Sequence, residues 1–223
     1  SNASSSNVSI ISSWGNADFK LPLAGDFNVA NALDVLATLL CWDIPLADAC
    51  AVLEKVTAPP GRMQYVDIEN GKGFPAVYVD YSHTPASLEA ALNALRPHCS
   101  GELWCVFGCG GDRDRGKRPM MGKVAALHSD CPVVTSDNPR SESPQEIMRD
   151  VLEGMEPGTT AIEDRSAAIE YAVSRADSTD TVLVAGKGHE HYQLIGNERV
   201  RFSDYETAAA SLKIRRDGNV AQS

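Results

Sequence analysis

Hydrophobic and polar positions divide the chain into two regions with different periodicity. In residues 28–42 and 45–57, Ala and Leu predominate and apolar side chains recur at the spacing of an amphipathic helix. The segment Ala58-Pro59-Pro60-Gly61 interrupts this pattern, because proline and glycine do not continue helices. We therefore expect two helices followed by a hinge. Their repeating positions are Leu33, Leu36 and Leu40 in the first helix and Leu46, Cys50 and Leu53 in the second.

Beyond the hinge, short apolar runs alternate with amphipathic segments. This alternation predicts an α/β fold with a mostly parallel, Rossmann-like sheet and helices on both faces. The expected strands are 76–80, 103–107, 131–135 and 181–185, and the expected helices lie near 85–96, 119–128, 144–153 and 166–176. In open sheets of this kind, ligands bind at the carboxyl ends of the strands. Asp80, Gly108, Ser136 and Gly186 fall at those ends.

Two helix starts have recognisable capping residues. Thr84 can cap a helix whose first position is Pro85, where proline is favoured. The segment Ser143-Pro144-Gln145-Glu146 has the spacing of a capping box, in which Ser143 and Glu146 each accept a backbone N–H. Both features support the helix placement.

Composition narrows the classes of partner. The 223 residues include 20 Lys and Arg against 30 Asp and Glu, and the net charge of -10 argues against nucleic acid or an anionic membrane surface as partner. No apolar run approaches the roughly 20 residues that a membrane span requires. The six cysteines have no C-x-x-C spacing, so we expect reduced core residues of a cytoplasmic protein. The first three residues, Ser1-Asn2-Ala3, resemble the remnant of a cleaved expression tag, and we expect the natural start to lie upstream.

The segment Asp137-Asn138-Pro139-Arg140 follows one of the expected strands. It presents an amide and a guanidinium fork at a rigid strand end, a combination that suits a ligand carboxylate. The alternative is an Asx-Pro turn with a solvated arginine.

A glycine-rich, basic loop spans residues 108–118. Four basic and two acidic side chains lie between residues 112 and 118, which points to an anionic ligand in a chain that is otherwise acidic. Two phosphate motifs fail here: Arg113 stands where the dinucleotide fingerprint needs glycine, and Arg118 stands where a Walker A loop needs Ser or Thr. The remaining alternative is a solvated glycine-rich turn.

Two further strand ends carry chemically active groups. Asp80 and His83 precede a helix N-terminus, where the carboxylate could accept hydrogen bonds from a ribose diol and where anions are favoured. The imidazole could instead be a simple helix-entry contact. The segment Gly186-Lys187-Gly188-His189-Glu190 offers a cation and an acid, and Glu190 could bind a substrate ammonium, although such loops are also common turns.

Six motifs in this order resemble the ATP-dependent muramyl ligases of peptidoglycan synthesis, and most closely those that add meso-diaminopimelate. The resemblance runs from about residue 12 to about residue 209. It rests on Gly25-x-Phe27-Asn28-x-x-Asn31, Gly61-Arg62-Met63, Asp80-Tyr81-Ser82-His83-Thr84-Pro85, Gly110-Gly111-Asp112-Arg113-Asp114, Asp137-Asn138-Pro139-Arg140 and Gly186-Lys187-Gly188-His189-Glu190.

The resemblance implies both a domain plan and a set of binding residues. Residues 4–60 would be the helical tail of a central ATP-binding domain, and residues 61–223 would be the C-terminal Rossmann-like ligase domain. ATP would be bound by Asn28, Asn31, Arg62, Asp80 and His83. Diaminopimelate would be bound by Arg113, Asp137, Asn138, Pro139, Arg140, Gly186 and Glu190.

The implied reaction joins meso-diaminopimelate to UDP-N-acetylmuramoyl-L-alanyl-D-glutamate. ATP and Mg²⁺ would activate the D-glutamate side-chain carboxylate as an acyl phosphate, which the amine of diaminopimelate attacks. The Walker A loop and the carbamylated lysine of the family would precede this sequence, so we expect no metal ligand and no activity in the chain alone. The alternatives are a lysine-adding or folylpolyglutamate-type ligase and a Rossmann nucleotide-binding module.

Overall fold

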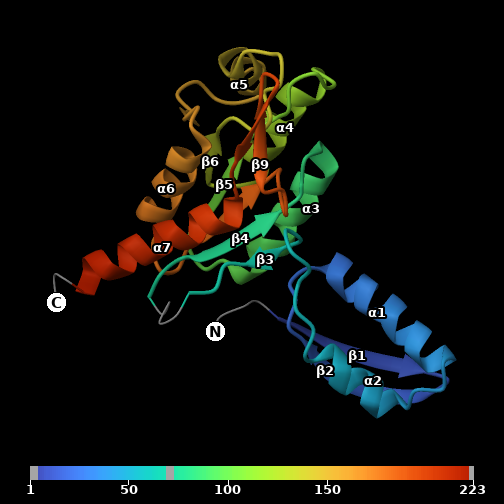
Figure 1. The fold of residues 1–223 in the computed structure, drawn as a ribbon. Helices are drawn as coiled ribbons and strands as arrows, with labels where there is room; N and C mark the ends of the chain where they lie inside the picture. The colour runs from blue at the N-terminus through green and yellow to red at the C-terminus, as the bar shows by residue number, and fades with distance from the viewer. Residues whose placement is uncertain (1–4, 69–72, 221–223) are drawn as a thin grey trace. The chain divides into compact units, whose positions relative to one another are not determined.

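The chain forms two compact units that meet at Pro59 and Pro60. Their structure, a computed structural model, describes the backbone of residues 5–68 and 73–220 (Figure 1). Each unit has its own hydrophobic core and is described by itself.

The smaller unit is a β-hairpin followed by two helices. Strands β1 (Ser6–Ser12) and β2 (Gly15–Leu21) pair antiparallel and precede α1 (Asp26–Cys41) and α2 (Leu46–Leu53). The expectation of a purely helical segment is therefore incomplete. In β2, Ala17, Phe19 and Leu21 alternate with polar residues, which is a strand pattern that the helical prediction overlooked. Leu36 and Leu40 are buried as expected, whereas Leu33 is 39% exposed and its place in the core is taken by Ala32.

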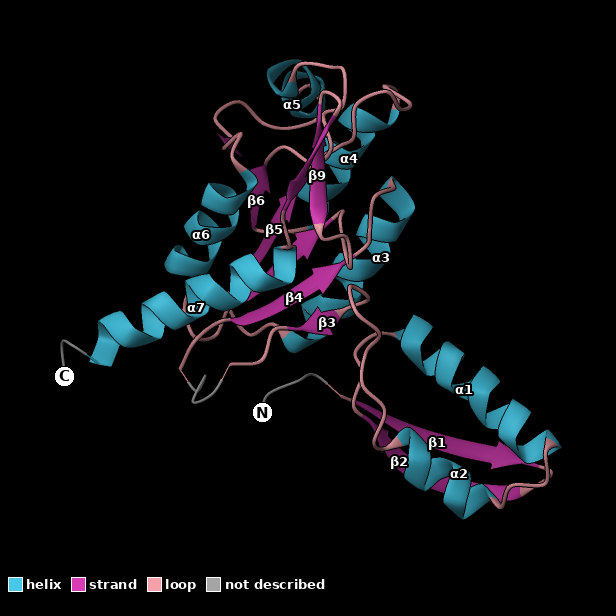
Figure 2. Ribbon diagram, viewed as in Figure 1, coloured by secondary structure: helices cyan, strands magenta, loops and turns pink. Residues whose placement is uncertain are grey.

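The larger unit is built on a six-stranded sheet in the order β3-β4-β8-β5-β6-β7 (Figure 2). Only the edge strand β3 runs antiparallel to its neighbour. The four expected strands are confirmed as β4 (Ala76–Asp80), β5 (Leu103–Phe107), β6 (Cys131–Val134) and β8 (Thr181–Ala185). The structure adds the two-residue strands β3 (Gln64–Tyr65) and β7 (Thr160–Ala161) and a hairpin of β9 (Tyr192–Ile195) and β10 (Glu198–Arg201).

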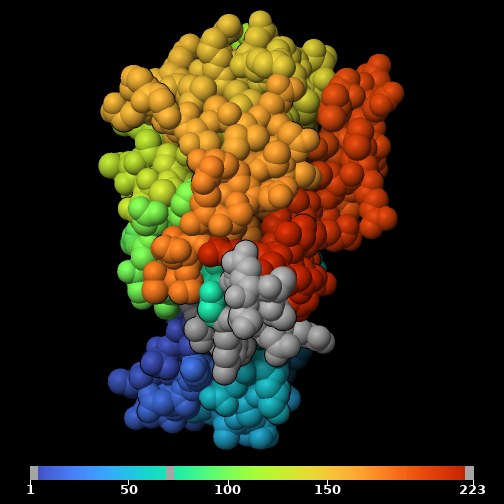
Figure 3. Space-filling view, turned by 90° about the vertical axis from the view of Figure 1, so that its left-hand side faces the viewer, coloured from blue at the N-terminus to red at the C-terminus, as the bar shows by residue number. Residues whose placement is uncertain are grey.

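Helices cover both faces of this sheet, as the sequence predicts. On one face, the core joins the sheet to α3 (Pro85–Leu95), α4 (Lys117–His128) and α5 (Pro144–Leu152); the 3-10 turn Arg96–His98 follows α3. On the other face it joins the sheet to α6 (Arg165–Arg175) and α7 (Asp204–Val220). Residues around α6, in orange, cover the sheet on the side that faces the viewer in Figure 3.

Alternation along the central strands explains this layering. In β5, Leu103, Cys105 and Phe107 point to the α3–α5 face, and Trp104 and Val106 point to the opposite face. Because successive side chains of a strand point to opposite faces, a strand covered on both sides is apolar throughout. The continuous apolar runs in the sequence are therefore central strands.

The expected N-cap at Thr84 is confirmed, and it forms a capping box with Ser87. Thr84 Oγ1 accepts a hydrogen bond from the Ser87 backbone N–H at 3.2 Å, and Ser87 Oγ accepts one from the Thr84 N–H at 3.0 Å. The expected box at Ser143 is wrong, because the Ser143 hydroxyl donates to Gln145 Oε1 at 2.6 Å and caps no backbone N–H.

All six cysteines are free thiols. Cys50 and Cys105 are buried, which agrees with the expected core positions, whereas Cys41 is exposed. The chain therefore has no disulfide to stabilise either core.

A buried ion pair joins α6 to the start of α7. Arg165 and Asp204 are 2% and 0% exposed, and the guanidinium donates two hydrogen bonds to the carboxylate at 2.7 and 2.8 Å. The same guanidinium donates to the carbonyl oxygens of Ala185 at 2.9 Å and Ser136 at 3.4 Å. Arg165 thus links the ends of β8 and β6 to both helices of one face.

Replacing Arg165 by methionine is expected to lower the free energy of unfolding by about 3–5 kcal/mol, because the Asp204 carboxylate loses its partner in a buried environment. Urea denaturation of both proteins measures the difference. The matched control Arg149→Met, at an exposed position of α5, should change the stability by less than about 0.5 kcal/mol. A loss no larger in Arg165→Met than in this control would contradict the role given to the ion pair.

Candidate functional site

The carboxyl ends of the parallel strands form one edge of the sheet, and the site loops leave from this edge. The strand-end residues lie next to one another: the Gly186 N–H donates to the Asp80 carbonyl at 3.1 Å, and a Cβ on Gly108 would lie 2.3 Å from the Thr135 carbonyl oxygen. The glycine after β5 is therefore required by close backbone packing.

A buried polar cluster connects the loop after β6 to the loop after β8. The Lys187 ammonium, with its side chain 0% exposed, lies 2.9 Å from Asn138 Oδ1 and 3.0 Å from Glu190 Oε2. Asn138 Nδ2 donates to the same Glu190 oxygen at 3.0 Å. Asp137 Oδ1 is 3.5 Å from the ammonium. The structure therefore brings together Asp137, Asn138 and Glu190, three of the residues expected to bind the amino-acid substrate.

The pKa values of the two carboxyl groups of this cluster shift in opposite directions. Burial raises the pKa of Asp137 above its ordinary value, and the nearby Arg165 and Lys187 oppose the shift. Burial also acts to raise the pKa of Glu190, but the hydrogen bonds from Lys187 and Asn138 outweigh it and lower the pKa. Glu190 is thus held as a carboxylate, the form that can bind an ammonium.

Arg140 is held in an unusual backbone conformation at the end of this segment. Its φ of 53° lies in the left-handed region, which is unfavourable for a residue with a Cβ. The Arg140 N–H donates to the Leu194 carbonyl at 3.0 Å, and the Arg140 carbonyl accepts from the Gly196 N–H at 2.7 Å. The guanidinium donates to the Gly111 carbonyl at 2.7 Å. Strain of this kind concentrates at functional sites.

The β9–β10 hairpin that holds Arg140 was missed by the sequence analysis. Besides the two bonds to Arg140, its Gln193 side chain donates to the Asp137 carbonyl at 2.8 Å and its Leu194 N–H donates to Asn138 Oδ1 at 2.9 Å. These contacts place β9 against the segment that follows β6. Gly196-Asn197, a two-residue connection typical of hairpins, is the sequence signal that could have found it.

The basic loop after β5 is fastened to the Arg140 segment. The Gly111 N–H donates to the Asn138 carbonyl at 2.9 Å, and a Cβ on Gly111 would lie 1.9 Å from the Pro139 oxygen. A Cβ on Gly110 would lie 2.8 Å from Arg140 Nη1 and 3.7 Å from Arg113 Cγ. The glycines of the loop therefore pack against the Arg140 segment, whereas residues 112–116 are exposed to solvent.

Glu142 anchors this loop through charge. It accepts hydrogen bonds from Arg118 and Arg115, each at 2.7 Å, and from the Asp112 N–H at 2.6 Å. The Arg118 hydrogen bond and the Asp112 N–H lower the pKa of Glu142 to about 2, from an ordinary value of 4.5. The Arg118 side chain is buried and also binds Asp150 at 2.8 Å. Sequence reasoning did not identify Arg118 or Glu142 as the support of the loop.

A second group of expected site residues lies around the end of β4. The exposed Arg62 guanidinium stacks over the Tyr81 ring at 4.8 Å, and the Tyr81 and His83 rings are 4.7 Å apart. His83 Nδ1 lies 2.8 Å from the Tyr81 carbonyl oxygen, which is the local helix-entry contact considered above. Gly188 packs here too, because a Cβ on it would lie 2.7 Å from Tyr81 Cβ.

The Asp80 carboxylate is largely used by hydrogen bonds within the protein. Its carboxylate accepts hydrogen bonds from the Met63 N–H at 2.8 Å, from the Ser82 N–H at 2.9 Å and from the Ser82 hydroxyl. Met63 has a φ of 44°, so these bonds fix the strained turn that presents Arg62. Asp80 therefore positions the Arg62 segment and has less free acceptor capacity than the sequence suggested.

Asn28 and Asn31 lie on α1 of the smaller unit and are described there alone. Asn28 Nδ2 donates to the Ala24 carbonyl at 2.7 Å, which fastens the start of the helix. Asn31 is exposed. Its amide is available for a ligand, whereas that of Asn28 is partly used.

The carboxyl edge of the larger unit has two guanidinium groups without an acidic partner and one carboxylate oxygen without a donor. Within the described part of the chain, Arg113 and Arg140 make no ion pair and Glu190 Oε1 accepts no hydrogen bond. Guanidinium groups bind carboxylates, and a free carboxylate oxygen binds an ammonium. The arrangement can hold a zwitterionic amino acid.

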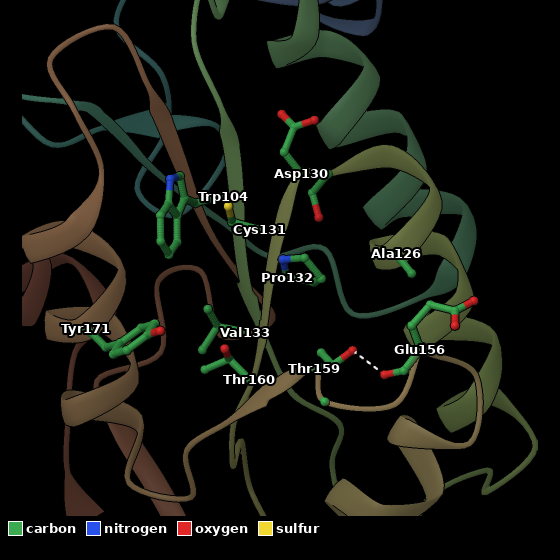
Figure 4. A pocket seen from close by; sticks show the side chains of 12 residues that line it. Trp104, Ala126, Asp130, Cys131, Pro132, Val133, Glu156, Thr159, Thr160 and Tyr171 are labelled. Atoms are coloured by element: carbon green, nitrogen blue, oxygen red, sulfur yellow. Dashed lines mark hydrogen bonds between the residues drawn. The ribbon is translucent and has the colours of Figure 1, made fainter.

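A hollow of about 420 Å³ lies at the opposite edge of the sheet (Figure 4). It is lined by the first residues of β5 and β6 and by Tyr171. Two of its polar side chains are hydrogen-bonded to backbone groups. Thr159 Oγ1 donates to the Glu156 carbonyl at 2.7 Å, and Asp130 Oδ2 accepts from the Leu103 N–H at 2.7 Å. This hollow lacks the converging free groups of the carboxyl edge.

Comparison with known proteins decides the family. The profile described as "Mur ligase, glutamate ligase domain" matches residues 61–188. The chain belongs to the Mur ligase family. The UDP-N-acetylmuramoyl-L-alanyl-D-glutamate--2,6-diaminopimelate ligase of Haemophilus influenzae strain Rd is 48% identical over 209 residues, which are 93% of this chain and 42% of that protein. The chain thus spans less than half the length of this relative.

Solved structures agree with the Mur ligase fold. A UDP-N-acetylmuramoyl-L-alanyl-D-glutamate--2,6-diaminopimelate ligase superposes with a TM-score of 0.72 at 37% identity, over 94% of this chain and 43% of that one. A pseudomurein peptide ligase type C from Methanothermus fervidus gives a TM-score of 0.64 at 19% identity, over 95% of this chain and 40% of that one. The second likeness concerns the fold alone.

The described residues contain neither a cluster of metal-ligating side chains nor a membrane-spanning helix. In that part of the chain, no group of three or more His, Cys, Asp or Glu side chains could hold a metal ion. No helix within the same residues is both long and apolar enough to cross a membrane.

The lowered pKa of Glu142 gives a pH dependence with a definite sign. Glu142 stabilises the fold above its ordinary pKa of 4.5, and this contribution is lost as the pH falls toward about 2. The stability difference between wild type and Glu142→Gln should therefore be larger at pH 7 than at pH 3, as measured by urea denaturation. Glu153→Gln, at an exposed position with no ion pair within the described chain, should differ little from wild type at either pH. A Glu142→Gln difference that grows on acidification would contradict the assignment.

Proposed function

We propose that this chain carries the amino-acid-binding part of an ATP-dependent ligase that adds meso-diaminopimelate to UDP-N-acetylmuramoyl-L-alanyl-D-glutamate in peptidoglycan precursor synthesis. The observation that carries the proposal is the set of uncommitted charges at the carboxyl edge: the guanidinium groups of Arg113 and Arg140 and one oxygen of Glu190. Family membership and the name of the Haemophilus influenzae relative support it. The cytoplasm, where nucleotide-linked precursors are made, is the proposed location.

The proposed ligand matches these charges in sign. Meso-diaminopimelate has two carboxylates and two ammonium groups, so its carboxylates would bind Arg113 and Arg140 and one ammonium would bind Glu190. The Asp137-Asn138-Pro139-Arg140 segment would form one wall, with Gly186 leaving room beside it. A Cβ at Gly186 would lie 2.7 Å from Asp137 Oδ2, so no larger residue fits there.

Selectivity against lysine follows from the distal carboxylate. Lysine lacks this group, so its binding would leave the half-buried Arg140 guanidinium without a carboxylate partner. Loss of one partner of a buried charge pair costs about 2–5 kcal/mol, or roughly thirtyfold to a few thousandfold in affinity. This penalty separates the proposal from a lysine-adding ligase. A bare nucleotide-binding module would have no use for three free groups of this kind.

ATP would be held at the other group of site residues. The Arg62 guanidinium is exposed and makes no ion pair within the described chain, so it can donate to a ribose or phosphate oxygen. We propose that Asp80 holds the Arg62 turn and offers its remaining lone pairs to the ribose, that His83 lies near the phosphates and that Asn28 and Asn31 face the adenine. ATP, with Mg²⁺ on its phosphates, supplies the phosphoryl group that activates the D-glutamate carboxylate.

The two units correspond to two parts of a larger enzyme under this proposal. Residues 4–60 would be the tail of the central ATP-binding domain, and residues 61–223 would be the C-terminal ligase domain. The length of the relatives supports this plan, since the chain spans 42% of the Haemophilus influenzae protein.

Removal of the Arg140 guanidinium should impair diaminopimelate binding selectively. In the full-length enzyme, Arg140→Ala is expected to raise the KM for meso-diaminopimelate at least roughly thirtyfold, since a substrate carboxylate loses its partner. The KM for ATP should change by less than about threefold, within the effect of a substitution outside its site. Steady-state kinetics with each substrate varied in turn measures both constants, and Arg149→Ala on α5 is the matched control. Equal rises in both constants would contradict the assignment.

The chain by itself is expected to be inactive. It has no Walker A loop within its 223 residues, so the purified chain should neither hydrolyse ATP nor form the amide product. A phosphate-release assay with the full-length enzyme as positive control tests this. ATPase activity of the purified chain above the blank would contradict the proposed division of labour.

A further inference from the structure

Lys187 is a fully buried cation inside the candidate amino-acid site. Its side chain is 0% exposed, and its ammonium is surrounded by Asp137, Asn138 and Glu190. Lysine is almost never fully buried unless it is paired. The glycines on either side, with φ values of 119° and 55°, allow the backbone turn that directs Lys187 inward. A cation is thus built into a site whose proposed ligand also carries ammonium groups.

The Lys187 ammonium and the Leu194 N–H together fix which way the Asn138 amide faces. Asn138 Oδ1 accepts hydrogen bonds from Lys187 Nζ and from the Leu194 N–H, both at 2.9 Å. The reversed amide would place its NH₂ group against two donors, so only one orientation satisfies the network. Asn138 Nδ2 consequently points toward Glu190, to which it donates one of its two hydrogens at 3.0 Å.

The same ammonium fixes one oxygen of Glu190 and leaves the other available. Glu190 Oε2 accepts from Lys187 Nζ and from Asn138 Nδ2, each at 3.0 Å. No group of the described chain donates to Oε1. Two donors on one oxygen hold the carboxylate in a single rotamer, so Oε1 is presented to a ligand in a fixed position.

We propose that Lys187 is a positioning residue for the amino-acid substrate: it orients the Asn138 amide and the Glu190 carboxylate so that Glu190 Oε1 receives the substrate ammonium. This inference rests on the proposed function of the site. Lys187 acts through Asn138 and Glu190 and does not itself contact the substrate.

Lys187→Met in the full-length enzyme tests the inference, because methionine has similar length but neither charge nor donors. We expect the KM for meso-diaminopimelate to rise by about 10- to 100-fold, the effect of a misplaced substrate contact, while the KM for ATP changes by less than about threefold. Lys123→Met, at an exposed position of α4, is the matched control and should leave both constants unchanged. A methionine variant with the wild-type KM for meso-diaminopimelate would overturn the inference.

A double-mutant cycle separates positioning from a general loss of stability. If Lys187 acts through Glu190, adding Lys187→Met to Glu190→Gln should raise the KM for meso-diaminopimelate by less than about threefold further. An equal factor in both backgrounds would overturn the inference.

If the methionine variant does not fold, Lys187→Arg is the second test variant, because arginine keeps the positive charge. The planar guanidinium cannot place its donors as the ammonium does, so the KM for meso-diaminopimelate should still rise selectively. An unchanged KM in this variant would overturn the inference. A wild-type enzyme that does not use meso-diaminopimelate would overturn the proposed function and this inference with it, whereas normal wild-type kinetics with an unaffected Lys187 variant would overturn the inference alone.

Discussion

The buried guanidinium of Arg165 holds the carboxyl edge of the sheet together, and the candidate site depends on that edge. Its two hydrogen bonds to Asp204 compensate for its burial, and its remaining donors bind the last carbonyl of β8 and the Ser136 carbonyl just after β6. The next residues along the chain are Gly186 and Asp137, where the two site loops begin. Breaking either carbonyl contact would leave donors of a buried guanidinium without a partner, at a large cost in free energy. The starts of the two loops are therefore fixed relative to each other.

Two groups of cationic side chains lie at this edge, and only one group forms ion pairs within the chain. Arg118, Arg165 and Lys187 are buried and paired, and they hold the loops in place. Arg113 and Arg140 remain without ion pairs in the described part of a chain whose net charge is -10. The paired cations therefore build the scaffold, and the unpaired cations and Glu190 define the chemistry of the ligand.

Local sequence patterns predicted the sheet and the site loops, and long-range contacts account for what they missed. The strands 76–80, 103–107 and 181–185 were found with their observed bounds, because each is an apolar run between turn residues. No residue of the β9–β10 hairpin is fully buried, so its periodicity gave no signal although Gly196-Asn197 marks its turn. The role of Lys187 depends on Asn138, 49 residues away, and a sequence pattern does not contain that contact.

The most direct test is a crystal structure of the full-length enzyme with meso-diaminopimelate bound. We expect its carboxylates within hydrogen-bond distance of the Arg113 and Arg140 guanidinium groups and one of its amino groups on Glu190 Oε1. The Asn138 amide and Lys187 should keep the positions that they have without ligand. A ligand bound away from this edge, or one whose amino groups face the two guanidinium groups, would contradict the account.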